Sequence, residues 1–309
     1  MSCECVDNTT VTCLNKNLLD LPLPLQGTKY LSVSDNRIQA LPSKGLEELH
    51  VLDLTNNDLS EWLTGATRLV NMGNLTHLHL RGNGLSTFKT GLFQELKNLT
   101  YLDLTENNVK MIPQKFLQGL SKLQTLSLSL NQIHTLSCGA FEEASELRVL
   151  HLNSNNIEVL DTCVFENCVN LNSLFLSNNH LKSVNQGTFR SAIGLVHLDL
   201  SSNMLITVPT DALKDTSNLT SLYLQKNAIS TPPTNDNVKS PASLTDAKLK
   251  ELLENISENQ GEGVQDSGET GHAVWFRDSV TEEETGVRAR GSRAEDVEVL
   301  FGSDKIGQD

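Results

Sequence analysis

Aromatic residues and long apolar runs are both scarce in this sequence. Of its 309 residues, 38% are hydrophobic but only 5% are aromatic, so a core must be built mainly from Leu, Ile and Val. No apolar run is long enough to cross a bilayer as a helix, so we expect no direct membrane insertion by this chain. The first ten residues, MSCECVDNTT, lack the apolar stretch of a signal peptide.

Basic residues are also under-represented. The sequence has 24 Lys and Arg against 38 Asp and Glu, a net charge of −14. Because nucleic acids and anionic membranes repel an acidic surface, we expect neither as a partner. The charge is uneven: residues 231–309 hold 17 acidic and 8 basic side chains, a balance of −9, which leaves −5 for the first 230 residues.

Motifs that carry catalysis are missing as well. The sequence contains no phosphate-binding loop, no HExxH pair and no nucleophile motif. We therefore expect neither enzyme activity nor a cofactor.

A repeat dominates the first 230 residues. The pattern L-x-x-L-x-L-x-x-N recurs in nine registers, with spacings of 21, then 26, then six times 24 residues between successive asparagines. Leu fills all three apolar positions in every register from Leu49 to Leu224, whereas the first has Thr28 and Val33. The repeated asparagines are Asn36, Asn57, Asn83, Asn107, Asn131, Asn155, Asn179, Asn203 and Asn227.

The spacing within each register predicts a short strand with one buried face. In x-L-x-L-x the apolar residues alternate with period two, and one such strand cannot bury its Leu face alone. Stacking successive strands in parallel makes a continuous core. The Asn follows the strand, where its amide can bond buried backbone groups of its own and the neighbouring turn. A Phe about ten residues later, as at Phe93, Phe141, Phe165 and Phe189, is expected to stack along the outer core.

This pattern resembles the typical 24-residue extracellular leucine-rich repeat, over residues 28–230. The resemblance implies an α/β solenoid, a curved horseshoe with a parallel concave β-sheet and an irregular or 3-10 convex side. It also implies a protein ligand, as in Toll-like receptors, Slit-type guidance proteins, small proteoglycans and lamprey variable receptors.

Residues 1–27 resemble the cysteine-rich N-terminal cap of these proteins. Cys3, Cys5 and Cys13 match the last three cysteines of its C-x3-C-x-C-x7-C pattern. The resemblance implies a disulfide between Cys3 and Cys13 and leaves Cys5 without its partner; three reduced cysteines are the alternative. The missing first cysteine and missing signal peptide lead us to expect that the natural start lies upstream.

The sequence after residue 230 departs from the family, because no cysteine follows Cys168. Residues 231–242 form a Pro-, Asn- and Ser-containing linker. In residues 243–259, Leu249, Leu252, Leu253 and Ile256 share one helical face, which favours a C-terminal helix over the end of the last repeat; a marginal helix in a disordered tail is the alternative. Residues 260–309 are acidic and are expected to be mostly disordered.

Cysteines and sequons within the repeats suggest covalent modification. Cys138 and Cys163 fall on adjacent turns, roughly 5 Å apart if the turns stack as strands, which permits a disulfide or two unpaired side chains. Cys168 matches a buried small apolar position. The N-x-[ST] pattern occurs at Asn8, Asn74, Asn98, Asn218 and Asn255, and the first four are our candidate glycosylation sites.

The outward strand positions are the candidate binding face, since they carry no packing role. Exposed aromatic side chains often anchor interfaces, although tolerated surface aromatics are the alternative. His79 lies between Asp53 and Asp103 on adjacent strands, but an open sheet lacks the enclosure of a metal site, so we expect no metal. The candidate ligand-binding residues are His79, Tyr101, Asp103, His151, Phe175, Asp199 and Tyr223.

These observations favour an extracellular or cell-surface recognition module that binds a protein ligand on the concave face. An intracellular leucine-rich repeat scaffold is the alternative. The protein partner includes the case of a second copy of this chain, which would form a homodimer.

Overall fold

The computed structural model describes residues 3–65 and 68–230. The predicted linker 231–242, helix 243–259 and tail 260–309 lie outside these residues.

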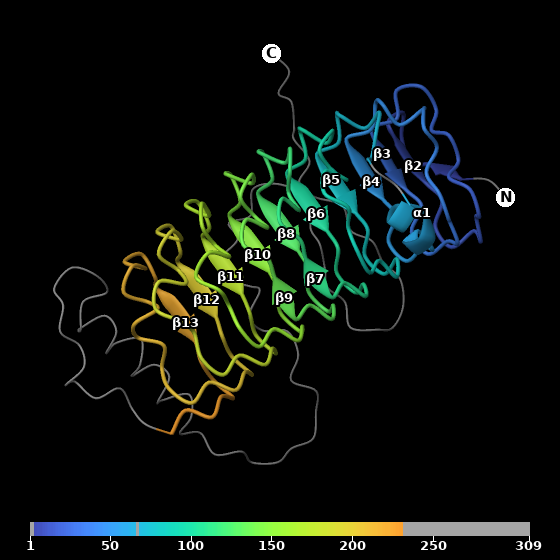
Figure 1. Cartoon of the computed structure of the whole chain (residues 1–309). Helices are drawn as coiled ribbons and strands as arrows, with labels where there is room; N and C mark the ends of the chain where they lie inside the picture. The colour runs from blue at the N-terminus through green and yellow to red at the C-terminus, as the bar shows by residue number, and fades with distance from the viewer. Residues whose placement is uncertain (1–2, 66–67, 231–309) are drawn as a thin grey trace. The chain divides into compact units, whose positions relative to one another are not determined.

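Nine short parallel strands carry the repeat, one for each asparagine register (Figure 1). They are β3 (Tyr30–Ser32), β4 (Val51–Asp53), β5 (His77–His79), β6 (Tyr101–Asp103), β8 (Thr125–Ser127), β10 (Val149–His151), β11 (Ser173–Phe175), β12 (His197–Asp199) and β13 (Ser221–Tyr223). Successive strands pair in register, so each central Leu lies beside the next, as Leu126 lies beside Leu150. The structure thus confirms the predicted solenoid.

The N-terminal cap extends this sheet, which the sequence did not predict. Strand β2 (Thr10–Thr12) pairs in parallel with β3, and β1 (Glu4–Cys5) pairs antiparallel with β2. Together with the nine repeat strands they make a sheet of eleven strands. The cap therefore covers the core of the first repeat with a strand instead of leaving an open edge.

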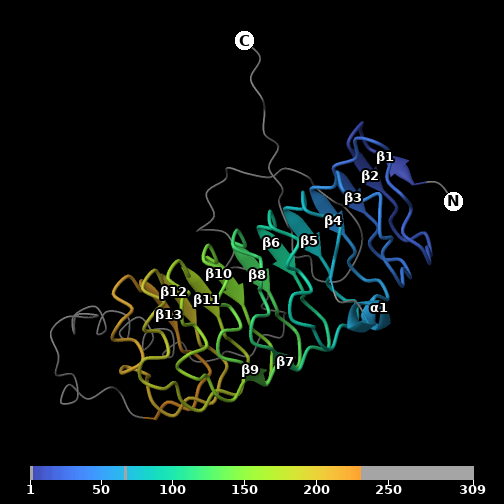
Figure 2. The same cartoon turned by 45° about the horizontal axis from the view of Figure 1, so that its top comes forward.

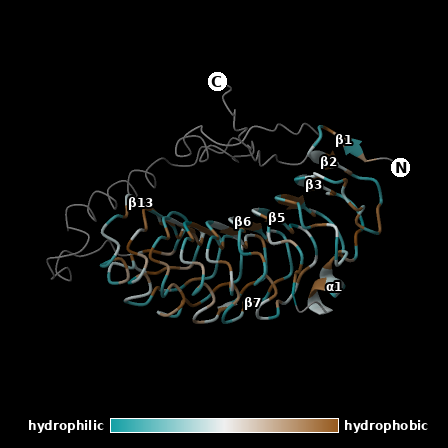
Figure 3. Cartoon of the chain, turned by 90° about the horizontal axis from the view of Figure 1, so that it is seen from above, coloured by the Kyte–Doolittle hydropathy of each residue, from teal (hydrophilic) through white to brown (hydrophobic). Residues whose placement is uncertain are grey.

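The loop side lies away from the main sheet and holds most of the remaining elements (Figure 2). There β7 (Met111–Ile112) pairs with β9 (Thr135–Leu136) in a second, two-stranded sheet. Helix α1 (Ser60–Gly65) lies in the 26-residue register. The prediction of an irregular or 3-10 loop side missed both elements. Figure 3 shows the strands along the inner side of the bend made by residues 3–230.

The core is a Leu layer behind the strands and a Phe layer beneath the loops. Leu126 and Leu150 are fully buried. Phe141 and Phe165 stack with ring centroids 6.2 Å apart, and Phe165 and Phe189 with centroids 5.9 Å apart. The layer also includes Phe88 and Phe116, with centroids 5.0 Å apart. Neither was predicted, because Phe88 falls five residues after Asn83, and Phe116 falls nine after Asn107, next to the repeated Phe position and not on it.

The repeated asparagines bridge successive turns, as Asn131 shows. Its Nδ2 donates to the carbonyl of Leu104 in the preceding turn, at 2.9 Å. It also donates to the carbonyls of Leu128 and Ser129 in its own turn, each at 3.1 Å. Its Oδ1 accepts the backbone N–H of Val109 at 3.0 Å. One buried amide therefore satisfies polar backbone groups on two turns, the role expected from the sequence.

The repeated asparagines form a ladder along the solenoid, and Asn83 is the exception in it. Its Nδ2 donates to the carbonyls of Leu54 and Arg81, but its Oδ1 is buried without a hydrogen-bond partner among the described residues. The N–H that corresponds to that of Val109 belongs to Leu59, immediately before α1. The helix therefore interrupts the ladder at the register with two extra residues.

Candidate ligand-binding face

The candidate residues lie on the outward face of consecutive strands. His79 lies on β5, Tyr101 and Asp103 on β6, and His151 on β10. The remaining three candidates lie on β11, β12 and β13, and all seven are half-buried rather than fully exposed. Their neighbours on adjacent strands cover part of each side chain, which the pattern of a single strand does not reveal.

Tyr101 packs against two histidines of the neighbouring strand. Its ring centroid lies 5.1 Å from that of His79 and 5.7 Å from that of His77, and the His77 pair is stacked. Burial, followed by the charge of Asp103, raises the pKa of the Tyr101 phenol, so the phenol keeps its proton. His77 was not a candidate, although it occupies the same outward column as Tyr101.

His151 and Phe175 form a second aromatic pair. Their rings are nearly parallel, with centroids 4.6 Å apart and an interplanar angle of 5°. We expected Phe175 to be exposed, but the imidazole covers one face of its ring. Burial lowers the pKa of His151 to about 4, against the opposing effect of Asp103. The imidazole is therefore neutral at neutral pH.

Apart from four histidines and three tyrosines, the ionisable side chains at the outward positions of the nine repeat strands are all aspartates. These positions contain Asp53, Asp103 and Asp199, and no Lys or Arg. Each aspartate uses Oδ1 to accept the backbone N–H two residues later, at 2.9–3.0 Å. Since these bonds hold the carboxylates at the strand ends, the face presents fixed negative charge.

Arg81, whose charge interacts with that of Asp103, is already paired with another carboxylate. The guanidinium of Arg81 donates to both carboxylate oxygens of Glu106, at 3.1 and 2.6 Å. This hydrogen bond, partly opposed by burial, raises the pKa of Arg81. The pair lies at the edge of the face, just beyond the strands.

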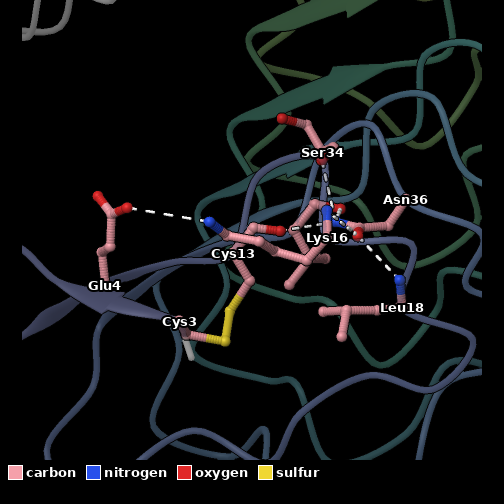
Figure 4. The surroundings of a disulfide bond; sticks show 8 residues. Cys3, Glu4, Cys13, Lys16, Leu18, Ser34 and Asn36 are labelled. Carbon is pink, nitrogen blue, oxygen red and sulfur yellow. Dashed lines mark hydrogen bonds and ion pairs between the residues drawn. A yellow bond between two sulfur atoms is a disulfide. The ribbon is translucent and has the colours of Figure 1, made fainter. Parts of the chain in front are cut away.

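The cap is held by a disulfide between Cys3 and Cys13, whose Cα atoms are 4.5 Å apart (Figure 4). Asn36 joins this cap to the first repeat, because its Nδ2 donates to the carbonyl of Cys13 at 2.6 Å. Cys5 is free and exposed. The pairing is the one that the resemblance implied.

Two further cysteines join adjacent turns of the repeats. Cys138 and Cys163 form a disulfide, with Cα atoms 5.1 Å apart. Cys168 is a buried free thiol, and burial raises its pKa to about 12. The loop-side disulfide thus links two neighbouring turns.

Asn255 lies outside the described residues, and three of the four sequons within them share one position in the repeat. The Nδ2 atoms of Asn74, Asn98 and Asn218 each donate to a carbonyl of the preceding turn, at 2.8–2.9 Å. Asn74 and Asn218 are exposed and Asn98 is half-buried, while Asn8 is exposed in the turn between β1 and β2. All four lie off the repeat strands.

Within residues 3–65 and 68–230, no group of three or more metal-ligating side chains comes together. Over the same residues, no helix is long and apolar enough to cross a membrane.

The sequence and fold match known leucine-rich repeats. The leucine rich repeat model matches residues 68–109, 97–157, 145–205 and 169–229. Human oligodendrocyte-myelin glycoprotein is 32% identical over 87 residues, which cover 27% of this chain and 19% of that protein. The mouse protein is 35% identical over 71 residues, covering 22% and 16%. The matched region is therefore less than a fifth of either relative.

Solved structures of Drosophila Toll, in complex with Spatzle, share the fold. The glycosylated form superposes with a TM-score of 0.63 at 24% identity, covering 72% of this chain and 32% of the matched chain. A second structure of the complex gives 0.61 at 25% identity, covering 71% and 31%. Since the matched repeats span residues 68–229, more than half of the sequence, the chain belongs to the leucine-rich repeat family.

Proposed function

We propose that this chain is an extracellular protein-recognition module and that it binds a protein ligand through the outward face of its strands. The contact is centred on His151, Phe175, Asp199 and Tyr223 and reaches Tyr101, Asp103 and His79 at its other end. The chain acts by binding and has no catalytic role in this proposal.

The aromatic pairs on the outward face carry the proposal. A sheet that needed only solubility could fill its outward positions with small polar residues, as β8 does with Thr125 and Ser127. Instead, Phe175 stacks on His151, and Tyr101 packs against two histidines. Rigid aromatic area of this kind is enriched among residues that dominate binding energy.

The cysteines support an extracellular location. Disulfides persist in oxidising compartments and are rare in the cytosol, and this chain has two. Toll binds Spatzle in the matched structures, and the sequence relatives are named as glycoproteins. The complex of Toll with Spatzle is consistent with a protein ligand for this chain, and the glycoprotein relatives are consistent with an extracellular location.

We propose that Asn8, Asn74, Asn98 and Asn218 carry N-linked glycans. Their positions off the repeat strands would leave the outward face accessible. Secreted expression followed by treatment with peptide-N-glycosidase should lower the mass of the protein. An unglycosylated protein with reduced cysteines would instead support an intracellular scaffold.

The binding proposal is tested with a panel of purified secreted and cell-surface proteins. For a protein that binds, Phe175→Ala should lower the affinity by ~1–3 kcal/mol, about 5- to 150-fold. The matched control is Val159→Ala, since Val159 is 60% exposed outside the strands. Thermal melts accompany both titrations. A lower melting temperature with unchanged affinity would make Phe175 a structural residue, and no change in either would place the contact elsewhere.

A further inference from the structure

The outward face has a gap in its aromatic side chains at β8. The two outward residues of β8 are Thr125 and Ser127, both short. Thr125 lies in register with Tyr101 on one side and Val149 on the other, and Ser127 lies between Asp103 and His151. Two strand spacings separate β6 from β10, roughly 10 Å between their backbones.

The walls of this gap are two rings whose outer faces are already covered. Phe175 stacks on the far side of His151, and His77 stacks on the far side of Tyr101. Stacked rings share a normal, so the second face of each wall ring points toward β8. The gap is therefore bounded by the Tyr101 ring and Val149 in one column and by Asp103 and the His151 ring in the other, and it is floored by the short side chains of β8.

A carboxylate stands at the edge of the same gap. The Oδ1 atom of Asp103 accepts the N–H of Thr105 at 2.9 Å, and within the described residues Oδ2 accepts no hydrogen bond. Arg81 is engaged by Glu106, and Ser127 is hydrogen-bonded to the hydroxyl of Thr105 at 2.7 Å. One oxygen of Asp103 is thus left for a donor from outside the chain.

We propose that this gap, bounded by Tyr101, Asp103 and His151 over β8, binds a basic side chain of the protein ligand, Arg or Lys. The inference rests on the proposed function, since it names the chemistry that the outward face selects. The carboxylate attracts the cation, and the ring faces bind a guanidinium or ammonium group through their π electrons. Arg fits best, because its planar guanidinium stacks on rings while donating to a carboxylate.

The charge of the surrounding face selects the same partner. Asp53 lies two strands beyond β6 and Asp199 two strands beyond β10, in outward columns that hold no Lys or Arg to compensate them. The neutral imidazole of His151 adds no repulsion toward a cation. A ligand with a basic surface is therefore attracted before contact, and its association slows as salt screens that attraction.

One segment of this chain also carries the arginines that the gap is proposed to bind. Residues 287–294 read VRARGSRA and carry Arg288, Arg290 and Arg293. The sequence after residue 230 has a net charge of −9, which the acidic face would repel. The occupant that we propose is an external protein, and the experiment below distinguishes it from this segment.

The test uses a library of phage-displayed, cysteine-constrained 12-residue peptides selected on the full chain. The enriched peptides should share an Arg or Lys, and the affinity of a synthetic consensus peptide should fall at least tenfold in Asp103→Asn. That variant keeps Oδ1 as acceptor for Thr105, so its melting temperature should not change. Asp161→Asn removes an exposed carboxylate outside the strands and should leave the affinity within twofold. Asp103→Glu, which keeps the charge, should bind more tightly than Asp103→Asn.

The peptide selection and the variants give a different result for each alternative explanation. Enrichment only of peptides without a basic residue, or equal binding by wild type and Asp103→Asn, would overturn the inference. If Phe175→Ala weakens binding while Asp103→Asn does not, the basic site is wrong but the proposed face stands. If neither weakens it, the proposed function fails too. Tighter peptide binding after Gln replaces Arg288, Arg290 and Arg293 would show that the chain's own segment occupies the site.

Discussion

The asparagine ladder predicts that the same substitution at two of its positions should lower the free energy of unfolding by different amounts. We compare Asn131→Ala with Asn83→Ala. Both asparagines are buried, at 8% and 1% exposure, and both occupy the same position in the repeat. They differ in their hydrogen bonds. The Oδ1 of Asn131 accepts the N–H of Val109 and that of Asn83 accepts none, while Nδ2 contacts three carbonyls in Asn131 and two in Asn83.

The magnitudes follow from the bonds that are lost. Asn131→Ala removes three donor bonds and one acceptor bond, and leaves the N–H of the fully buried Val109 without a partner. The two hydrogens of Nδ2 are shared among the three carbonyls and together contribute about 2 kcal/mol, and the orphaned N–H costs about 1–3 kcal/mol, so we expect a loss of about 3–5 kcal/mol. Asn83→Ala removes two donor bonds and also a buried oxygen that has no partner. We expect it to cost about 1–2 kcal/mol.

Urea unfolding followed by far-UV circular dichroism measures both variants, with wild type as the reference. The free energy of unfolding should fall by about 2 kcal/mol more for Asn131→Ala than for Asn83→Ala, by difference of the bonds above. Equal losses would refute the bond-by-bond reasoning. They would mean that side-chain volume, which is the same at both sites, sets the cost.

Two further predictions concern backbone space and pH. Gly119→Ala should lower the free energy of unfolding by about 2–4 kcal/mol, because φ is +87° and a Cβ would lie 2.5 Å from the carbonyl oxygen of Gln94. Gly27 has the same φ and no atom within 4 Å of its Cβ position, so Gly27→Ala should lower the free energy of unfolding by only about 1 kcal/mol. Equal shifts in the melting temperatures of the two variants would contradict the role of the contact with Gln94. Burial lowers the pKa of His151 from 6.5 to about 4, so the unfolded chain binds its proton first and stability should fall as pH drops from 6.5 toward 4, by at most about 3 kcal/mol. Melts of wild type and His151→Gln across this range measure the effect, and equal pH dependence would contradict it.

The repeat strands were predictable because local spacing encodes them. Alternating Leu residues specify a strand with one buried face wherever it is placed, and the Asn that follows specifies a buried turn. The disulfide between Cys138 and Cys163 was permitted by counting residues from two successive asparagines. The pairing of Cys3 with Cys13 came from resemblance to a known cap.

The elements that were missed depend on contacts between turns. Strand β2 forms only because β3 offers an unpaired edge, and β7 forms only against β9. Helix α1 lies in the register that has two extra residues, and sequence spacing revealed the insertion but not its conformation. Phe88 and Phe116 joined the Phe layer through rings that meet across turns.

The sequence by itself determined the number of repeats, the phase of every strand and the outward position of the seven candidate residues. Period two fixes which side chains face away from the core. Only the tertiary structure decided which of these side chains meet. The pairing of Tyr101 with His77 and His79, and of His151 with Phe175, depends on the register between strands separated by 24 residues. The gap over β8 arises in the same way, because it is bounded by residues that become neighbours only when the turns stack.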